Sequence, residues 1–276
     1  MKFGFYLSNT GPSATPDNLI AIARKGDELG FDCMVVGDHI VVPKSIVSHY
    51  PYTVSGEFPG GETGDYLEQL TLLTFLAAVT KRIRLVPSVM ILPHRNPVVV
   101  AKTLATLDYL SNGRLTFGIG VGWMKEEFEA LSLPPFEERG AVSDEYLRAI
   151  LELWTSDDPS FDGKYCSFSN ISFLPKPVQK PHPPVWVGGQ TRRAIRRAAE
   201  LGDGWHPVGA QPAAPLEPEK LSEDMKLLAR YAERAGRDPA NIELSMKAPL
   251  YDSSRATGGE RRRFVGEPQQ IVSDIH

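Results

Sequence analysis

The strongest constraint on the fold is a repeating alternation, in which a short β-branched or aromatic run is followed by a helical pattern. Hairpin turn signals are nearly absent between these units, which favours parallel strands joined by right-handed crossovers. Seven such repeats within 276 residues predict one (β/α)8 barrel domain over residues 1–276, rather than an open doubly wound sheet. The expected strands cover residues 3–7, 31–37, 83–89, 115–120, 185–188, 204–206 and 242–247.

Expected helices cover residues 17–29, 67–79, 97–110, 125–131, 136–154, 191–201, 216–235 and 268–276. The helix at 97–110 has the clearest bounds, because a proline opens it and Gly113 follows its end. No eighth strand is found, so we expect a truncated chain or a barrel that lacks its last strand and helix. Long insertions near 43–65 and 160–184 interrupt the alternation of strands and helices, and loops of this length are usually functional. The second insertion can hold a small hairpin.

Composition excludes several classes of function. The chain has 30 basic and 34 acidic residues, so nucleic acid is not an expected partner. Cys33 and Cys166 stand alone, which argues against a disulfide framework and a cysteine-bound metal, and we expect no metal site. The N-terminal residues show no secretory leader, and no apolar stretch approaches the ~20 residues of a membrane helix. A cytoplasmic enzyme without a membrane partner is expected.

Gly37-Asp38-His39 follows the second expected strand. Catalytic groups of barrels gather at the carboxyl ends of strands. His39 can exchange a proton near neutral pH, and Asp38 can tune it or contact a cofactor ring. The alternative is a capping carboxylate beside a solvated histidine, and position alone does not decide between the two.

Glycine-rich turns follow two later strands. In the segment 118–123, alternate glycines including Gly120 and Gly122 would let a ligand approach the backbone, although the spacing is not the dinucleotide fingerprint. Gly188-Gly189-Gln190-Thr191 leads into an arginine-rich helix, and free N–H groups at a helix start can bind an anion. The alternatives are a tight turn capped by Thr191 and a solvated arginine face.

Two further segments have an ordinary explanation. Residues 87–97 are typical of a strand, a loop and a helix capped by Asn96. Trp205, in a short expected strand, either belongs to the core or reaches the mouth of the barrel.

Taken together, the motifs resemble the bacterial luciferase-like monooxygenase and reductase family, from Phe3 to at least Trp205. The Asp38-His39 pair resembles the branch that uses the deazaflavin coenzyme F420. The motifs that carry the resemblance are Leu92-Pro93-x-x-Asn96-Pro97, Leu107-Asp108-x-Leu110-Ser111-x-Gly113-Arg114, Phe117-Gly118-Ile119-Gly120-x-Gly122-Trp123, Pro183-Pro184-Val185-Trp186-Val187-Gly188-Gly189 and Ala198-Ala199-Glu200-x-Gly202-Asp203-Gly204-Trp205.

This resemblance implies a TIM-type barrel that binds F420 or a flavin such as FMN at its carboxyl edge. His39 is then the catalytic histidine, with Asp38 beside the ring. Ser88-Val89 corresponds to a non-prolyl cis peptide that backs the ring. The loop of Gly188, Gly189, Gln190 and Thr191 would bind the cofactor phosphate. The other expected cofactor contacts are Gly120, Gly122, Asp38, Ser88 and Val89.

The expected function is hydride transfer between coenzyme F420 and a small organic substrate. The alternatives are a monooxygenase that uses reduced FMN and O2, supplied by a reductase partner, and a non-catalytic flavin-binding paralogue. Trp123, Trp205 and the aromatic loop 50–66 would shape an apolar substrate pocket. Sugar-phosphate dehydrogenases of this branch carry an acidic residue at the position of Trp123, which argues against a glucose-6-phosphate activity. The resemblance also implies a homodimer.

Overall fold

The computed structural model describes residues 1–60, 64–211, 213–248, 251–252 and 264–275. Within them, parallel strands form one curved ribbon in the order β1-β2-β3, then β4-β5-β8-β9-β10, and a parallel bridge between Leu85 and Leu115 joins the two parts. Because neighbouring strands are parallel, their carboxyl ends meet at one edge. These strands are β1 (Gly4–Tyr6), β2 (Cys33–Val36), β3 (Arg84–Pro87), β4 (Met90–Ile91), β5 (Phe117–Gly120), β8 (Val185–Gly188), β9 (Gly204–His206) and β10 (Glu243–Leu244).

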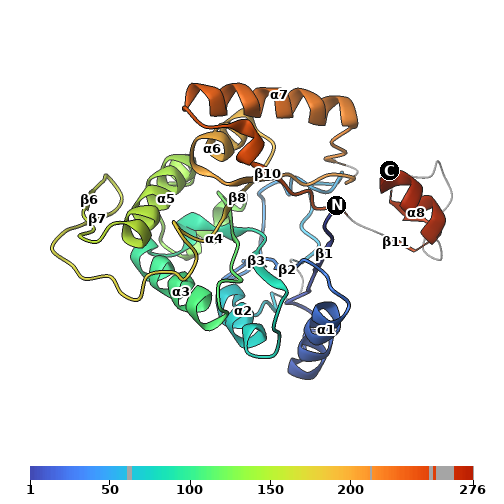
Figure 1. Cartoon of the computed structure of the whole chain (residues 1–276). Coiled ribbons are helices and arrows are strands. Elements are labelled where there is room, and N and C mark those ends of the chain that lie inside the picture. Colours follow the sequence, from blue (N-terminus) through green and yellow to red (C-terminus); the bar gives the residue numbers. More distant parts are fainter. Residues whose placement is uncertain (61–63, 212, 249–250, 253–263, 276) are drawn as a thin grey trace.

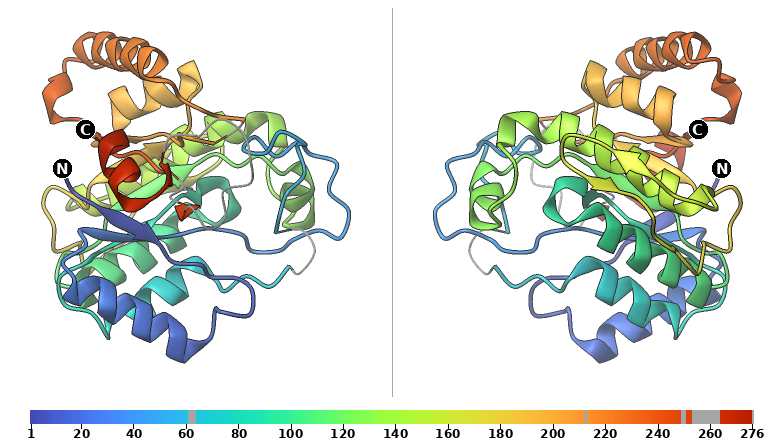
Figure 2. Two further views of the ribbon diagram at one scale, coloured as in Figure 1. Left: turned by 90° about the vertical axis from the view of Figure 1, so that its right-hand side faces the viewer. Right: turned by 90° about the vertical axis from the view of Figure 1, so that its left-hand side faces the viewer.

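A layer of helices covers the outside of this ribbon (Figures 1 and 2). The fold is the predicted α/β barrel of TIM type. Apolar side chains fill the space between the helices and the strands, with Phe117, Trp154 and Trp205 among the largest fully buried ones. The long helices of the layer are α1 (Pro16–Glu28), α2 (Gln69–Ala77), α3 (Pro97–Leu110), α5 (Arg139–Thr155), α6 (Arg192–Leu201) and α7 (Pro218–Arg234).

Shorter elements follow the strands or lie apart from them. The insertion 160–184 holds the expected hairpin, formed by antiparallel β6 (Phe161–Asp162) and β7 (Ser167–Phe168). None of the described helices is long and apolar enough to cross a membrane. The remaining elements are η1 (Leu92–His94), α4 (Lys125–Ala130), η2 (Phe136–Glu138), η3 (Pro239–Asn241), β11 (Tyr251–Asp252), β12 (Val265–Gly266) and α8 (Pro268–Ile275).

The structure divides two segments that the sequence pattern treats as continuous. The strand expected over 83–89 ends at Pro87, and the chain resumes as β4 after the Ser88–Val89 peptide, which is cis as the family resemblance implies. The helix expected over 136–154 opens with the 3-10 turn η2 before α5 begins. Among the described residues, β1 pairs only with β2 and β10 only with β9, so an eighth barrel strand does not join them.

Candidate active site

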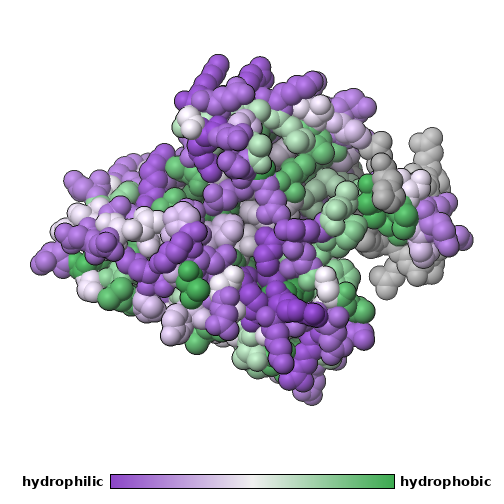
Figure 3. Space-filling view, in the orientation of Figure 1, coloured by the Kyte–Doolittle hydropathy of each residue, from purple (hydrophilic) through white to green (hydrophobic). Residues whose placement is uncertain are grey.

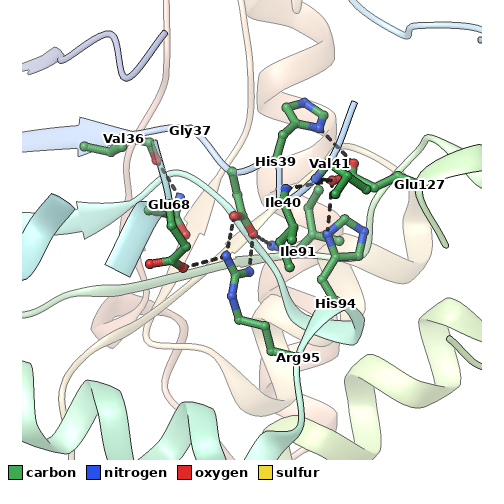
Figure 4. Close-up of polar contacts among 12 residues, drawn as sticks. Val36, Gly37, His39, Ile40, Val41, Glu68, Ile91, His94, Arg95 and Glu127 are labelled. Carbon is green, nitrogen blue, oxygen red and sulfur yellow. Dashed lines mark hydrogen bonds and ion pairs between the residues drawn. The ribbon is translucent and has the colours of Figure 1, made fainter. Parts of the chain in front are cut away.

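His39 and Glu127 form a buried pair at the carboxyl edge (Figure 4). His39 follows β2, and Glu127 lies in the first turn of α4, which follows β5. His39 Nδ1 lies 2.8 Å from Glu127 Oε2, while Glu127 Oε1 accepts hydrogen bonds from the N–H groups of Ile40 and Val41. Burial alone would raise the pKa of Glu127, but its hydrogen bond to His39 and the nearby histidines lower that pKa overall. Glu127 is therefore an ionised carboxylate that fixes the start of the loop after β2.

Asp38, which precedes His39, has both carboxylate oxygens engaged by its own chain. Its two carboxylate oxygens each accept a hydrogen bond from the Arg95 guanidinium at 2.8 Å, and Oδ2 also accepts one from Ile91 N. Arg95 donates a further bond to Glu68. The side chain of Asp38 has no exposed surface, so the pair is a bidentate ion pair that ties β2 to β4.

His94 is a second histidine on Glu127. Its Nδ1 lies 3.8 Å from Glu127 Oε1, and neither ring nitrogen has a hydrogen-bond partner among the described residues. Burial lowers the pKa of His94 to about 4, against the attraction of Glu127 and Asp38. At neutral pH His94 is consequently uncharged, and its ring packs edge-on against Phe128.

The cis peptide lies between this cluster and β9. Ser88 Oγ is 2.9 Å from His206 Nε2, and His206 Nδ1 faces the carbonyl and hydroxyl oxygens of Ser245. Burial lowers the pKa of His206 to about 4, with the charge of Lys247 adding to the effect. His206 thus belongs to the framework that holds Ser88.

The glycines at the strand ends do permit a close approach, and the approaching atoms are those of the chain itself. A Cβ on Gly120 would lie 2.4 Å from Val89 Cγ2, and one on Gly188 would lie 2.8 Å from Val89 Cγ1. Gly122, at φ +84°, leaves room for Phe128 and Ile91. Packing around Val89 therefore accounts for Gly120 and Gly188 without a ligand.

Aromatic rings cover His39. Its ring centroid lies 4.9 Å from that of Phe58, 5.0 Å from that of Tyr66 and 6.5 Å from that of Trp123. Tyr50 packs on Phe58 and Trp123 in turn. We call Tyr50, Phe58, Tyr66 and Trp123 the aromatic cover, and it leaves His39 8% exposed.

The start of α6 lies at the same edge of the sheet. Thr191 Oγ1 accepts a hydrogen bond from Ala194 N and so caps the helix, while the first N–H groups have no acceptor within it. The positive charge of Arg193 acts on Arg139, whose pKa is lowered first by burial and further by this charge. Arg193, in the first turn of α6, thus adds positive charge to the helix start that follows Gly188, Gly189 and Gln190.

Trp205 does not line an open site. It is 1% exposed, belongs to the core, and donates its indole N–H to Gly189 O at 2.8 Å. The sequence patterns also missed Glu127, Arg95 and His94 as members of the site. An acidic pair in the first turn of a helix that follows a barrel strand is the signal that points to Glu127.

The sequence and the fold are similar to those of known oxidoreductases. The family model of luciferase-like monooxygenases matches residues 1–257. The chain is 33% identical to an uncharacterized protein of Mycobacterium tuberculosis, over 99% of this chain and 94% of that one. It is 29% identical to the F420-dependent glucose-6-phosphate dehydrogenase of Amycolatopsis mediterranei, over 90% of this chain and 69% of that one. It is also 36% identical to the FMNH2-dependent dimethylsulfone monooxygenase of Pseudomonas putida, over 50% of this chain and 38% of that one.

Among solved structures, the monooxygenase RslO1 from Streptomyces bottropensis superposes with a TM-score of 0.73 at 28% identity, covering 92% of this chain and 73% of that one. The family match spans nearly the whole chain and the fold agrees with it. The chain belongs to the luciferase-like monooxygenase family of oxidoreductases.

Proposed function

We propose that the protein is an oxidoreductase that transfers a hydride between coenzyme F420 and a small organic substrate. The observation that carries the proposal is the position of His39, a histidine with one nitrogen engaged by Glu127 and its ring under an aromatic cover, at the edge where α6 begins. The motif Asp38-His39 favours the deazaflavin branch. The relative that uses F420 matches 90% of this chain, whereas the one that uses FMNH2 matches half of it.

The residues at this edge fit a phosphorylated, ring-bearing cofactor in the chemistry they offer. The start of α6, with Arg193 in its first turn, supplies N–H donors and positive charge for a phosphate group. Ser88 and Val89, between β3 and β4, would back the ring, and Gly188, Gly189, Gln190 and Thr191 would hold its phosphate. When bound, the deazaflavin supplies the redox chemistry, and the protein supplies positioning and electrostatics.

The protein's own part is to hold a proton at His39 and to exclude water. His39 would exchange that proton with the substrate heteroatom bonded to the carbon that gains or loses the hydride, which is a general acid–base role. The aromatic cover offers apolar surface to the substrate and keeps bulk water from the reacting atoms. Trp123 stands beside His39 in place of an acidic side chain, so we do not expect a sugar phosphate as the substrate.

A fluorescence titration with F420 and with FMN tests the cofactor. We expect F420 to bind tightly and FMN weakly, and we expect Arg193→Ala to weaken F420 binding severalfold. Arg196→Ala is the matched control, because Arg196 lies one turn further on the same helix and pairs with Glu200. Tight FMN binding without any F420 binding would overturn the proposal.

The alternative is a monooxygenase that uses reduced FMN and O2. The 36% identity to a dimethylsulfone monooxygenase and the likeness to RslO1 favour it. Such an enzyme consumes O2 when a flavin reductase supplies reduced FMN, and an F420-dependent reductase does not. Turnover with either cofactor excludes a non-catalytic paralogue.

A further inference from the structure

The contacts of Glu127 bear on which nitrogen of His39 carries the proton. Glu127 Oε1 accepts from Ile40 N at 2.8 Å and from Val41 N at 3.3 Å, which leaves Oε2 to face His39 Nδ1 at 2.8 Å. An ionised carboxylate only accepts hydrogen bonds. In neutral His39 the proton therefore belongs on Nδ1, and Nε2 carries the free lone pair.

Other charged and titratable groups lie around Glu127, but none of those named next competes with His39 for its carboxylate. His94 on η1 is uncharged at neutral pH, because burial lowers its pKa to about 4. Burial, with a smaller effect of Glu127, raises the pKa of Tyr66 to about 12, so this phenol stays neutral. Arg95 directs its guanidinium to Asp38 and Glu68.

We infer that Glu127 is a positioning residue that holds neutral His39 in the Nδ1–H tautomer and leaves Nε2 as the proton acceptor. Once protonated, the same Nε2 becomes the donor, so a single atom serves both directions of a reversible hydride transfer. This use rests on the proposed function, whereas the tautomer is a property of the protein alone.

Replacing Glu127 by glutamine should reverse the tautomer of His39. In Glu127→Gln the amide oxygen is needed by the N–H groups of Ile40 and Val41, so the amide nitrogen faces His39 Nδ1. That nitrogen is a donor, and Nδ1 must then accept. Neutral His39 would change to the Nε2–H tautomer with little change in shape.

The test is NMR of the cofactor-free protein with 15N-labelled histidine, which distinguishes protonated from unprotonated ring nitrogens. The chain has six histidines, and the His39 signals are assigned from their loss in His39→Asn. For the neutral imidazole of His39, we expect Nδ1–H in the wild type and Nε2–H in Glu127→Gln. Glu126→Gln is the matched control, because Glu126 precedes Glu127 and binds the N–H groups of Val47 and Ser48 instead.

An Nε2–H signal in the wild type would overturn the inference, and so would a Glu126→Gln variant that switches the tautomer equally. The wild-type spectrum decides even where Glu127→Gln does not fold. With the cofactor bound, we expect Glu127→Gln to lower kcat about 100-fold with little change in KM. Failure to bind F420 would refute the proposed function and leave the tautomer assignment standing.

Discussion

At the scale of single residues, Asp38 shows how burial decides what a carboxylate does. Its side chain has no exposed surface, and both oxygens are taken by Arg95. Asp38→Asn would place an amide N–H against a buried guanidinium and leave that charge without its main partner. We expect the free energy of unfolding to fall by about 3–5 kcal/mol, measured by urea denaturation.

Asp32→Asn is the control for this change. Asp32 precedes the same strand and also pairs with an arginine, Arg84, but its side chain is 22% exposed. Solvent screens that pair, so we expect a loss of about 1 kcal/mol or less. Equal losses for the two variants would show that burial does not govern the Asp38 pair.

His94 makes the stability of the protein depend on pH. Its pKa falls from the ordinary 6.5 to about 4 on folding, so the unfolded chain binds a proton that the folded chain rejects between those values. Stability from this group is therefore complete above pH 6.5 and falls as the pH drops to 4, by about 3 kcal/mol. Chemical denaturation at pH 7 and pH 4 measures the difference.

His94→Leu removes this titrating group and should reduce the loss between pH 7 and pH 4 by that amount. His49→Leu, at an exposed position, should leave the pH dependence unchanged. A His94→Leu variant with the wild-type pH profile would place the source of the acid sensitivity elsewhere.

Sequence patterns predicted the caps at Asn96 and Thr191, which the structure confirms, and proposed His39 as a site residue, because each prediction needs only a few adjacent residues. Asn96 Oδ1 indeed accepts from Val98 N and Val99 N. The sequence patterns did not identify Glu127, because its partner His39 lies 88 positions away. Such a pairing depends on strand order and not on the local pattern. The same distance effect hid Arg95, which otherwise resembles an ordinary loop residue.

At the scale of elements, Val89 joins β4 to the glycines of β5 and β8. Gly120→Ala would bring a methyl group to 2.4 Å from Val89 Cγ2. We expect this overpacking to cost about 1–3 kcal/mol of stability. Val89→Ala removes both Cγ atoms. The double variant should therefore lose less stability than the sum of the losses of the two single variants, as a double-mutant cycle measured by thermal denaturation would show. Strict additivity would argue against the contact.

Adjacent carboxylates of α4 bind the loop after β2, which carries Tyr50, Phe58 and Tyr66 of the aromatic cover. Glu126 Oε1 accepts from Val47 N at 2.7 Å and from Ser48 N at 2.9 Å. Glu126→Ala should leave global stability nearly unchanged while it speeds proteolysis within residues 43–60, because loop backbone loses two hydrogen bonds. Glu129→Ala, one turn further on the exposed face, should have no such effect. Unchanged cleavage in Glu126→Ala would mean that the rings alone hold the loop.

Element bounds were predictable where capping residues mark them. Helix α3 spans Pro97–Leu110 as expected, since Asn96 and Pro97 open it and Gly113 follows. Strand bounds were less well defined: residues 83–89 form a largely apolar, β-branched segment, and nothing local reveals that the strand breaks at Ser88–Val89. Only the likeness to the family indicated the break.

At the scale of the whole molecule, parallel order brings distant segments to one edge. His39 after β2 and Gly189 after β8 are 150 positions apart, yet both follow carboxyl ends of the same ribbon (Figure 1). The alternation of strands and helices was enough to predict this, because parallel neighbours must point the same way. It could not predict which side chains turn inward at that edge.

The ribbon has a seam between its end strands, and we expect it to be the least protected part of the sheet. Among the described residues, β1 and β10 each pair on one side only, and Tyr6, Leu244 and Met246 are 39–43% exposed there. Hydrophobic surface is visible in this region, below α7 (Figure 3). Lys247 Nζ reaches across the seam and lies 4.2 Å from the ring centroid of Tyr6.

Native-state hydrogen exchange should therefore show faster exchange in β1 and β10 than in β5 and β8, which have neighbours on both sides. Lys247→Met, which removes the cation above Tyr6, should speed exchange in β1 further and leave β5 unchanged. Lys226→Met, on the outer helix α7, is the control for loss of a charge. Protection in β1 equal to that in β8 would show that contacts other than strand pairing close the seam, and that the ribbon opens as one unit.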